Sequence, residues 1–331
     1  MSQHFLLSSR AKTLSLAQVL RLSDAEAEVL FKLVRWPETQ GEPICPKCGS
    51  FAVYECRRPS GAPRWRCKGC GGDFSITSGT LFASHKLPLR HYLATIAIFC
   101  NEVKGKSALA LSRDLKTTYK SAFVLAHKLR EAMAAEVKGH RIGGEGKVAA
   151  IDGAYFGGYV KPANFRENRR DRRLFHNQNG KRQVVVVARE HNGYTVPGTF
   201  LTEVSALPFI LSHVEKGTIV NADEAGGWNA LHSRYDMRRI NHEEAYSDGN
   251  ACTNDAESFF SRLRRAEVGH HHHVAGIYLN RYAQESAWRE DKRRVSNGEQ
   301  VKAVSGLAMK LRPSVDFCGY WQRHKQAITK R

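Results

Sequence analysis

The sequence predicts a multidomain α/β protein in which a small ribbon and a helical region precede a mixed sheet. Three observations carry this prediction. Two cysteine pairs lie within residues 45–70, helical apolar patterns fill residues 87–133, and apolar strand-like runs alternate with helical ones from residue 147 onward. With 331 residues, the chain is long enough for two or three domains.

The charge balance is strongly basic. Lysine and arginine number 51 against 32 acidic residues, which gives a formal net charge of +19 and a pI near 9.7. An excess of this size favours a nucleic acid, bound through phosphate contacts. No apolar run approaches the ~20 residues that a membrane span requires, and the first residues lack a secretory signal pattern. We therefore expect a cytoplasmic protein.

Four of the eight cysteines form two C-x2-C pairs. Cys45 and Cys48 make the first pair, Cys67 and Cys70 make the second, and 18 residues separate the pairs. This is the spacing of a four-thiolate zinc site, and the glycines after each pair favour tight turns that aim both sulfurs at one ion. A disulfide framework is the alternative, which a cytoplasmic location disfavours. We predict a zinc ribbon over residues 41–82, in which the metal supplies the folding energy.

Helical patterns flank the ribbon. Ser23 followed by Glu26 predicts a capped packing helix that ends before Pro37. After the ribbon, residues 87–133 form three helices, of which the second is short and the third, from residue 119, is longer and basic. A short helix, a tight turn and a longer helix resemble a helix-turn-helix, whose second helix enters a DNA major groove. A plain helical connector is the alternative.

From residue 147 the pattern mixes strands and helices. The expected strands lie at residues 147–153, 182–190, 193–203, 218–222 and 239–241. Strand, hairpin, strand, helix, strand, helix, strand, helix is the order expected of a ribonuclease-H-like mixed sheet, whose first and fourth strands lie side by side. The arginine-rich stretch 159–182 has little to bury, so we expect a mobile insertion that meets phosphates.

Two of the expected strands end in an aspartate. Asp152 follows the apolar run of the first strand, and Asp223 follows the fourth. Two carboxylates that meet at one edge of a sheet can hold magnesium, which prefers oxygen ligands in octahedral geometry. The alternative is that both aspartates cap turns or helices.

The helix expected over residues 252–267 carries further polar side chains. At roughly 100° per residue, Asn254, Glu257 and Arg264 fall within about 80° of one another on one helical face. Asn254 or Glu257 would complete the metal ligands, and Arg264 would hold a phosphate. An ordinary capped helix with a charged, exposed face is the alternative.

These motifs together resemble a known family. The chain is similar to insertion-sequence transposases of the D-D-E superfamily, in the zinc-ribbon group called XO-two-like. The resemblance covers roughly residues 23–294 and rests on these stretches, in the family's order: RWP before the CPKCG ribbon, FSITSGTLFASHKLPLRHYL, GKSALALSRDLKTTYKSAF, IDGAYFGG, NADE, TNDAESFFSRLRR and HHHVAGIYLNRYAQESAWRED.

The resemblance implies which residues act. The family carries Asp, Asp and Asn, with Glu in place of Asn in some branches, and a downstream basic residue that is usually lysine. By motif these positions fall on Asp152, Asp223, Asn254 and Arg264. Glu257 is the second choice for the third position, since two aspartates neutralise only half the charge of two divalent ions. The family's tyrosine-histidine-histidine position falls on His270–His273, where a solvated loop is the alternative to contact with DNA or metal.

The resemblance also implies a reaction and its partners. Terminal inverted repeats of double-stranded DNA would be bound and then cut and joined with two Mg2+ or Mn2+ ions, in a synaptic homo-oligomer at the nucleoid. A non-catalytic, domesticated DNA-binding protein and a stand-alone nuclease of the same fold are the rival hypotheses.

The expected DNA contacts are basic or aromatic residues of the ribbon, the helical region and the insertion: Arg57, Arg64, Lys116, Tyr119, Lys120, Lys128, Arg170 and Arg173. The expected domains are an N-terminal helical segment (1–40), the ribbon (41–82), the helix-turn-helix-like region (83–138), the catalytic domain (147–295) and a basic tail (296–331).

Overall fold

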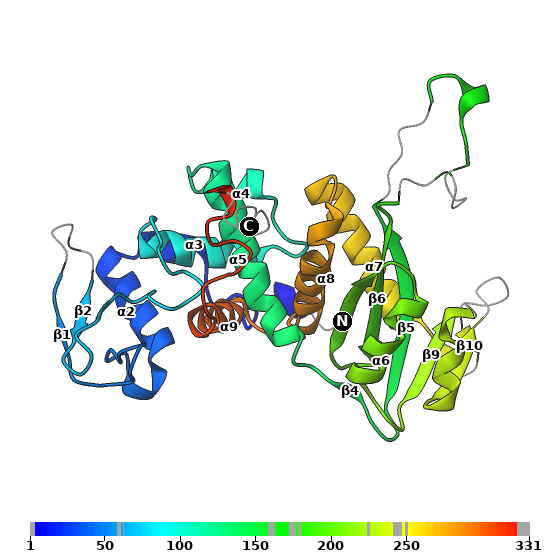
Figure 1. The fold of residues 1–331 in the computed structure, drawn as a ribbon, viewed down its shortest axis with the longest axis horizontal. Helices are drawn as coiled ribbons and strands as arrows, with labels where there is room; N and C mark the ends of the chain where they lie inside the picture. The colour runs from blue at the N-terminus through cyan, green and yellow to red at the C-terminus, as the bar shows by residue number, and fades with distance from the viewer. Residues whose placement is uncertain are drawn as a thin grey trace, which may run out of the picture. The chain divides into compact units, whose positions relative to one another are not determined.

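Figure 1 shows the computed structural model of the chain, which describes residues 4–57, 61, 63–157, 163–171, 177, 180–223, 226–240, 247–248 and 251–322. The chain divides into two compact units. The first unit combines residues 1–135 with residues 292–331, and the second spans residues 136–291. The first unit is therefore built from two separate stretches of sequence. Within the described residues, none of the helices has both the length and the apolar character that crossing a bilayer requires.

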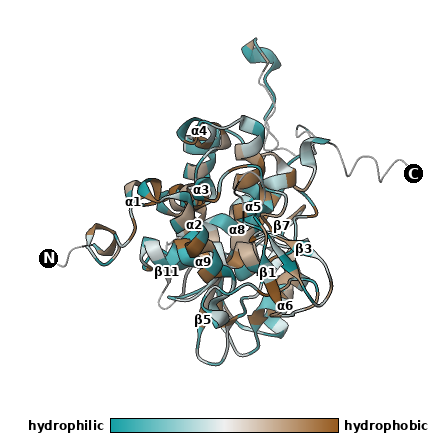
Figure 2. Cartoon of the chain, turned by 90° about the vertical axis from the view of Figure 1, so that its left-hand side faces the viewer, coloured by the Kyte–Doolittle hydropathy of each residue, from teal (hydrophilic) through white to brown (hydrophobic). Residues whose placement is uncertain are grey.

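The N-terminal helices of the first unit begin at side-chain caps. A 3-10 turn (η1, Phe5–Leu7) precedes α1 (Leu16–Arg21) and α2 (Asp24–Arg35). The hydroxyl of Ser23 accepts a hydrogen bond from the backbone N–H of Glu26, and the Glu26 carboxylate accepts one from the backbone N–H of Ser23. Ser15 caps α1 in the same way. The capped helix predicted from Ser23 is confirmed, and both helices show hydrophobic and hydrophilic positions in Figure 2.

The ribbon is a three-stranded antiparallel sheet. Its strands are β1 (Val53–Glu55), β2 (Trp65–Cys67) and β3 (Asp73–Phe74), in that order, after a 3-10 turn (η2, Pro37–Thr39). The ring of Trp36 lies 5.9 Å from that of Trp65 and 6.5 Å from that of Phe74, measured between centroids. All three rings are buried and form a small aromatic core under the sheet.

Three helices follow the ribbon: α3 (Leu89–Asn101), α4 (Ala108–Asp114) and α5 (Tyr119–Val137). The short helix, turn and longer helix are thus present, with Lys116 in the turn at a φ of 50°. Only the first turn of α5 is exposed, however, and its later side chains are buried or half-buried. His127 and Arg130, for example, are each 1% exposed. A helix that reads a major groove presents a longer exposed face, so α5 serves largely as a packing helix.

The segment predicted as a basic tail contains a buried helix instead. α9 (Asn297–Lys310) packs against α2 and α3, and a 3-10 turn (η8, Tyr320–Gln322) follows it. Val301, Val304 and Ala308 of α9 are buried. Their i, i+3, i+7 spacing makes one apolar stripe, which the basic residues around it obscure in the sequence.

The second unit is built on a five-stranded mixed sheet. Its strands are β5 (Val148–Phe156), β6 (Gln183–Glu190), β7 (Thr195–Phe200), β9 (Ile219–Asp223) and β10 (Asp236–Ile240), arranged in the order β10-β9-β5-β6-β7. β5, β9 and β10 run parallel to one another, whereas β6 is antiparallel to β5 and to β7. The first and fourth strands of this sheet, β5 and β9, lie side by side as the sequence predicts. Two small sheets pair β4 (Ile142–Gly143) with β8 (Val214–Glu215) and β11 (Ser247–Asp248) with β12 (Ala251–Cys252).

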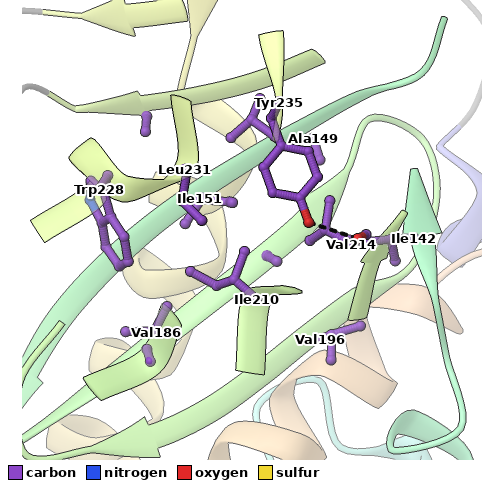
Figure 3. Close-up of a cluster of buried hydrophobic side chains, with 14 of the residues drawn as sticks. Ile142, Ala149, Ile151, Val186, Val196, Ile210, Val214, Trp228, Leu231 and Tyr235 are labelled. Carbon is purple, nitrogen blue, oxygen red and sulfur yellow. Dashed lines mark hydrogen bonds between the residues drawn. The ribbon is translucent and has the colours of Figure 1, made fainter. Parts of the chain in front are cut away.

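Helices cover both faces of this sheet (Figure 1). On one face, the turn η5 (Val204–Ala206), α6 (Leu207–His213) and the 3-10 helix η6 (Gly226–Ser233) close over a buried cluster that includes Ile151, Val186 and Trp228 (Figure 3). The hydroxyl of Tyr235 donates a hydrogen bond of 2.8 Å to the backbone oxygen of Val214 inside this cluster. On the other face, α7 (Asn254–Ala266) and α8 (Gly276–Asp291) contact the strands.

The remaining turns lie in the segments for which a mobile insertion and a histidine loop are predicted. A 3-10 turn (η3, Arg166–Asn168) belongs to the arginine-rich stretch, of which only residues 163–171, 177 and 180–182 are described. A π-helical turn (η7, Glu267–His271) joins α7 to the segment before α8. His270 and His271 are half-buried in it, and His272 and His273 are exposed.

Candidate functional site

Asp152 and Asp223 occupy facing positions on adjacent strands. β5 and β9 pair in parallel with Ile151 opposite Ala222, so the next pair in the same register is Asp152 and Asp223. Adjacent strands lie about 4.8 Å apart, which makes these two residues neighbours across the sheet. Ile151 and Ala222 belong to the buried cluster, and side chains alternate along a strand, so the side chains of Asp152 and Asp223 start from the other side of the pleat, where α7 packs against β5.

The strand that carries Asp152 is longer than predicted. The predicted strand ends at residue 153, but β5 continues to Phe156 because residues 152–156 pair with residues 183–187 of β6. β9, by contrast, ends at Asp223. Asp152 therefore lies inside a strand rather than in a turn, at the point where pairing with β9 stops. The interpretation of Asp152 as a turn cap does not fit this position.

Burial and neighbouring charges raise the pKa of Asp152 to about 6. Burial of the carboxyl group has the largest effect, and a hydrogen bond of 2.6 Å from the backbone N–H of Gly153 opposes it. The negative charges of Asp223, Glu203 and Glu257 raise the pKa further. Four carboxylates therefore lie close enough to one another for their charges to interact.

Besides Asp152, two more of the four carboxylates accept hydrogen bonds. The indole Nε1 of Trp228 donates a hydrogen bond of 2.9 Å to Oδ1 of Asp223. Trp228 is fully buried in the cluster under the sheet, so its indole is a rigid donor. On α7, the hydroxyl of Thr253 donates a hydrogen bond of 3.0 Å to Oε1 of Glu257.

α7 begins at Asn254, close to the predicted helix start, with Thr253 as its N-cap residue. Asn254 and Arg264 are exposed, and Glu257 is half-buried. Glu257 is the member of this predicted set whose charge raises the pKa of Asp152. The structure thus brings Glu257 into the electrostatic environment of the two aspartates.

Glu203 is a neighbour that sequence reasoning missed. A Cβ placed on Gly153 would lie 2.8 Å from Oε1 of Glu203, and a Cβ on Gly227 would lie 3.3 Å from its Cβ. Two glycines therefore leave the space that Glu203 fills beside Asp152. Burial and the charge of Asp223 raise the pKa of Glu203. The available signal was its position at the end of the strand predicted over residues 193–203, but no motif distinguishes it from other glutamates at strand ends.

The four cysteines of the two C-x2-C pairs meet in the ribbon. The Sγ atoms of Cys45 and Cys70 lie 3.7 Å apart, and those of Cys48 and Cys67 lie 3.5 Å apart. Four sulfurs at about 2.3 Å from a tetrahedral zinc ion are separated by roughly 3.8 Å, so this cluster fits a structural zinc site. Among the described residues, it is the only group of three or more metal-ligating side chains whose ligand atoms all lie within 4.8 Å of one another.

Comparison with protein families matches both parts of the chain. The transposase zinc-ribbon domain matches residues 22–72, and the ISXO2-like transposase domain matches residues 145–291. The two matches follow each other in the expected order and together cover more than half of the sequence. The chain belongs to the ISXO2-like transposase family. A comparison with curated proteins found no match.

The match places the predicted site residues of this transposase in two separate domains. The range 145–291 contains Asp152, Asp223, Asn254, Glu257 and Arg264, and the range 22–72 contains the four cysteines. The zinc ribbon of a transposase implies DNA binding, and the net charge of +19 agrees with this.

Two arginines predicted as DNA contacts of the transposase are ion-paired within the ribbon region. Arg57 pairs with Glu28 at 3.3 Å and with Glu55 at 2.6 Å. Arg64 pairs with Asp73. Acidic neighbours therefore compensate both charges locally, which leaves these arginines less available to phosphates than the sequence suggests.

The other predicted contacts of the transposase differ in exposure. Lys116, Tyr119 and Lys120 are exposed around the start of α5, and Lys128 is half-buried. Burial lowers the pKa of Lys128, and the negative charges of Cys318 and Glu131 oppose this effect. Arg170 is exposed, and Arg173 lies outside the described residues.

Proposed function

We propose that this transposase cuts and joins DNA strands at the edge of the sheet where Asp152 and Asp223 face each other. The pairing of β5 with β9 is the single observation that carries the proposal, because its register makes the two aspartates neighbours. The strand order β10-β9-β5-β6-β7, with only β6 antiparallel to its neighbours on both sides, supports a ribonuclease-H-like fold. In such a sheet the first and fourth strands deliver the acidic residues.

The side chains at this edge fit a pair of divalent magnesium or manganese ions. All the donors are carboxylate oxygens, which such hard cations prefer. Four carboxylates with mutual repulsion, from Asp152, Asp223, Glu203 and Glu257, carry the charge that two divalent ions would neutralise. When bound, the ions would polarise the phosphodiester of the substrate and lower the pKa of a water molecule.

Each residue of the chain then has a distinct task. Asp152 and Asp223 would hold the ions, and the hydrogen bonds from Gly153 and Trp228 fix the direction of their carboxylates. We assign the third ligand to Glu257 in preference to Asn254, because Glu257 is half-buried and interacts with Asp152 through its charge.

Two further residues complete the proposed site. Glu203 approaches the aspartates from the face opposite α7 and adds the fourth negative charge. Arg264, exposed on α7, contacts a phosphate of the bound DNA.

The proposed substrate is the terminal inverted repeat of an insertion sequence, bound as double-stranded DNA. The ribbon and the first unit would recognise the repeat, and a synapse of two ends implies a homo-oligomer. Such a protein acts at the nucleoid in the cytoplasm.

Incubation of the purified protein with magnesium and DNA carrying its element ends tests the proposal. We expect a cut at the transposon end followed by joining to target DNA. Asp152→Asn and Asp223→Asn should abolish both steps and leave end binding intact. Strand transfer by either variant would refute the assignment. End binding without any cleavage by the wild-type protein would instead support a domesticated DNA-binding protein, and cleavage without joining would support a stand-alone nuclease.

A further inference from the structure

A basic cavity lies in the first unit. Its volume is about 350 Å3, and its lining comes from the loop at residues 83–87, Tyr92 of α3, residues 118–128 at the start of α5, and residues 317 and 319–322. The cavity joins stretches that are about 230 residues apart in sequence, and neither family match covers any of them. The loop contains Ser84 at a φ of 59°, a left-handed backbone that holds the turn beside α5.

The charge of the cavity is uniformly positive. Lys86, Lys120 and Lys128 line it, and none of its described lining residues is an aspartate or a glutamate. None of these lysines forms an ion pair with a described residue, in contrast to Arg57 and Arg64 of the ribbon region. The cavity therefore concentrates positive charge that a phosphate would neutralise.

Two of the lysines belong to one stripe of α5. Lys120, Val124 and Lys128 follow each other at intervals of four residues, so all three lie on neighbouring turns of one helical face. Lys120 and Lys128 are separated by about 12 Å along the helix axis. Lys128 is half-buried, so its ammonium group is partly removed from water, and the negative charges of Cys318 and Glu131 offset part of this cost.

Part of the cavity lining is aromatic. The rings of Tyr320 and Trp321 lie 5.1 Å apart, and Trp321 lies 5.8 Å from Phe123 of α5. The indole Nε1 of Trp321 donates a hydrogen bond of 3.2 Å to the backbone oxygen of Lys120, which fixes the ring at the rim. Trp321 nevertheless stays 41% exposed, so part of its surface is free to stack on a ligand.

The ammonium group of Lys120 lies 5.6 Å from the centroid of the Trp321 ring. Cations beside an exposed aromatic ring are the combination with which proteins bind a single nucleic-acid strand: the cations contact phosphates and the ring stacks on a base. A helix lying in a major groove does not need such a cavity, and α5 exposes only its first turn.

We propose that this cavity binds a short stretch of a single DNA strand, with its phosphates at Lys86, Lys120 and Lys128 and one base against Trp321. The inference rests on the proposed function only in taking DNA as the substrate. It assigns the first unit a contact with a displaced or terminal nucleotide rather than with the groove of a continuous duplex. Base stacking is tolerant of sequence, so this contact would add affinity without reading the repeat.

The test uses the full chain without magnesium, so that no strand is cut. A single-stranded oligothymidylate of about six nucleotides serves as the probe. The other four tryptophans are at most 6% exposed, so binding in the cavity should quench the fluorescence of Trp321. Free thymidine monophosphate and inorganic phosphate are titrated in parallel. We expect the oligonucleotide to bind at least about 10-fold more tightly than either, because neighbouring phosphates add contacts.

Variants test the contributions of the aromatic ring and of the lysines separately. Trp321→Phe should abolish the fluorescence change, and Trp321→Ala should weaken binding by about 10-fold or more. The double variant Lys120→Gln, Lys128→Gln should lower affinity and reduce the slope of log affinity against log salt by about 1 to 1.5. Lys302→Gln is the matched control, since Lys302 is exposed on α9 and does not line the cavity. Circular dichroism and thermal melting of each variant establish that it is folded.

Wild-type affinity in the folded double variant or in Trp321→Ala would overturn the proposal. Equal binding of thymidine monophosphate and the oligonucleotide would overturn the assignment to a DNA strand and leave a free-nucleotide site. Asp152→Asn should bind the probe like the wild type. Loss of cleavage in that variant with unchanged probe binding therefore distinguishes the catalytic proposal from this one.

Discussion

The indole of Trp228 donates a 2.9 Å hydrogen bond to Asp223, and so links the buried cluster under the sheet to the carboxylate at its edge. Trp228→Phe keeps an apolar ring in the cluster but removes the donor. We expect strand-cleavage rates to fall about 10- to 100-fold, because the Asp223 carboxylate loses its fixed direction. Rates measured under single-turnover conditions, together with the free energy of unfolding, check this prediction.

Trp288 provides a matched control for this substitution. It is also buried in the second unit, and its indole donates a 2.8 Å hydrogen bond to the carboxylate of Glu136. Trp288→Phe should therefore lower the free energy of unfolding by a similar amount, about 1–3 kcal/mol, but leave the cleavage rate of the folded protein unchanged. Equal loss of activity in both variants would mean that Trp228 acts only through stability.

The space beside Asp152 requires a glycine at position 153. Gly153→Ala would place a methyl group 2.8 Å from Oε1 of Glu203, so the glutamate has to move. We expect a loss of about 1–3 kcal/mol in the free energy of unfolding and a marked fall in cleavage. Urea denaturation and the cleavage assay measure the two effects.

A second substitution tests whether the contact with Glu203 causes the loss of stability in Gly153→Ala. Glu203→Ala removes the group that the new methyl would meet, so the double variant should recover most of the stability that Gly153→Ala loses. Cleavage should stay low in the double variant, since the fourth negative charge is missing. Additive destabilisation in this cycle would contradict the contact.

The pKa of Asp152 predicts a pH dependence of stability in the absence of magnesium. Folding raises this pKa from 3.8 to about 6, so the folded state holds the proton more tightly than the unfolded state does. The contribution to stability is then fully present below about pH 4 and is lost as the pH rises through about 6. Two pKa units correspond to roughly 3 kcal/mol in the free energy of unfolding.

Asp152→Asn removes this titration. We expect the variant to lack the decline between about pH 4 and pH 7 and to be more stable than the wild type at neutral pH. Urea denaturation of both proteins across this range provides the measurement. A wild-type stability that rises relative to the variant over the same range would contradict the raised pKa.

The cysteine cluster predicts a metal-dependent ribbon. Cys67→Ser should remove one equivalent of bound zinc and unfold the ribbon, because this small domain depends on the ion for its folding energy. Hydrogen exchange should show lost protection in β1–β3 and retained protection in β5 and β6. Cys56→Ser is the matched control: Cys56 is half-buried in the same domain, outside the cluster, and its variant should keep the zinc.

Local signals in the sequence predicted the local features of the fold. The capping pair Ser23 and Glu26, the C-x2-C spacing and the apolar strands before Asp152 and Asp223 each depend on residues close in sequence. Such features are determined by backbone geometry over a few residues, so a pattern is enough to find them.

Features that depend on distant partners were predicted less well. β5 extends past Asp152 only because β6 pairs with it, and Glu203 reaches the site only because two glycines leave room. The sequence gives no sign that Arg57 is ion-paired, because its partner Glu28 lies in a different segment of the chain. No short pattern contains these pairings, since each is made by residues that the fold brings together.

The return of α9 to the first unit has a consequence for biosynthesis. The ribosome synthesises the whole second unit before residues 292–331. The apolar surface of α2 and α3 that α9 covers therefore stays exposed until the chain is almost complete. A gene fragment that stops at residue 291, where the family match ends, would leave that surface permanently bare and favour aggregation.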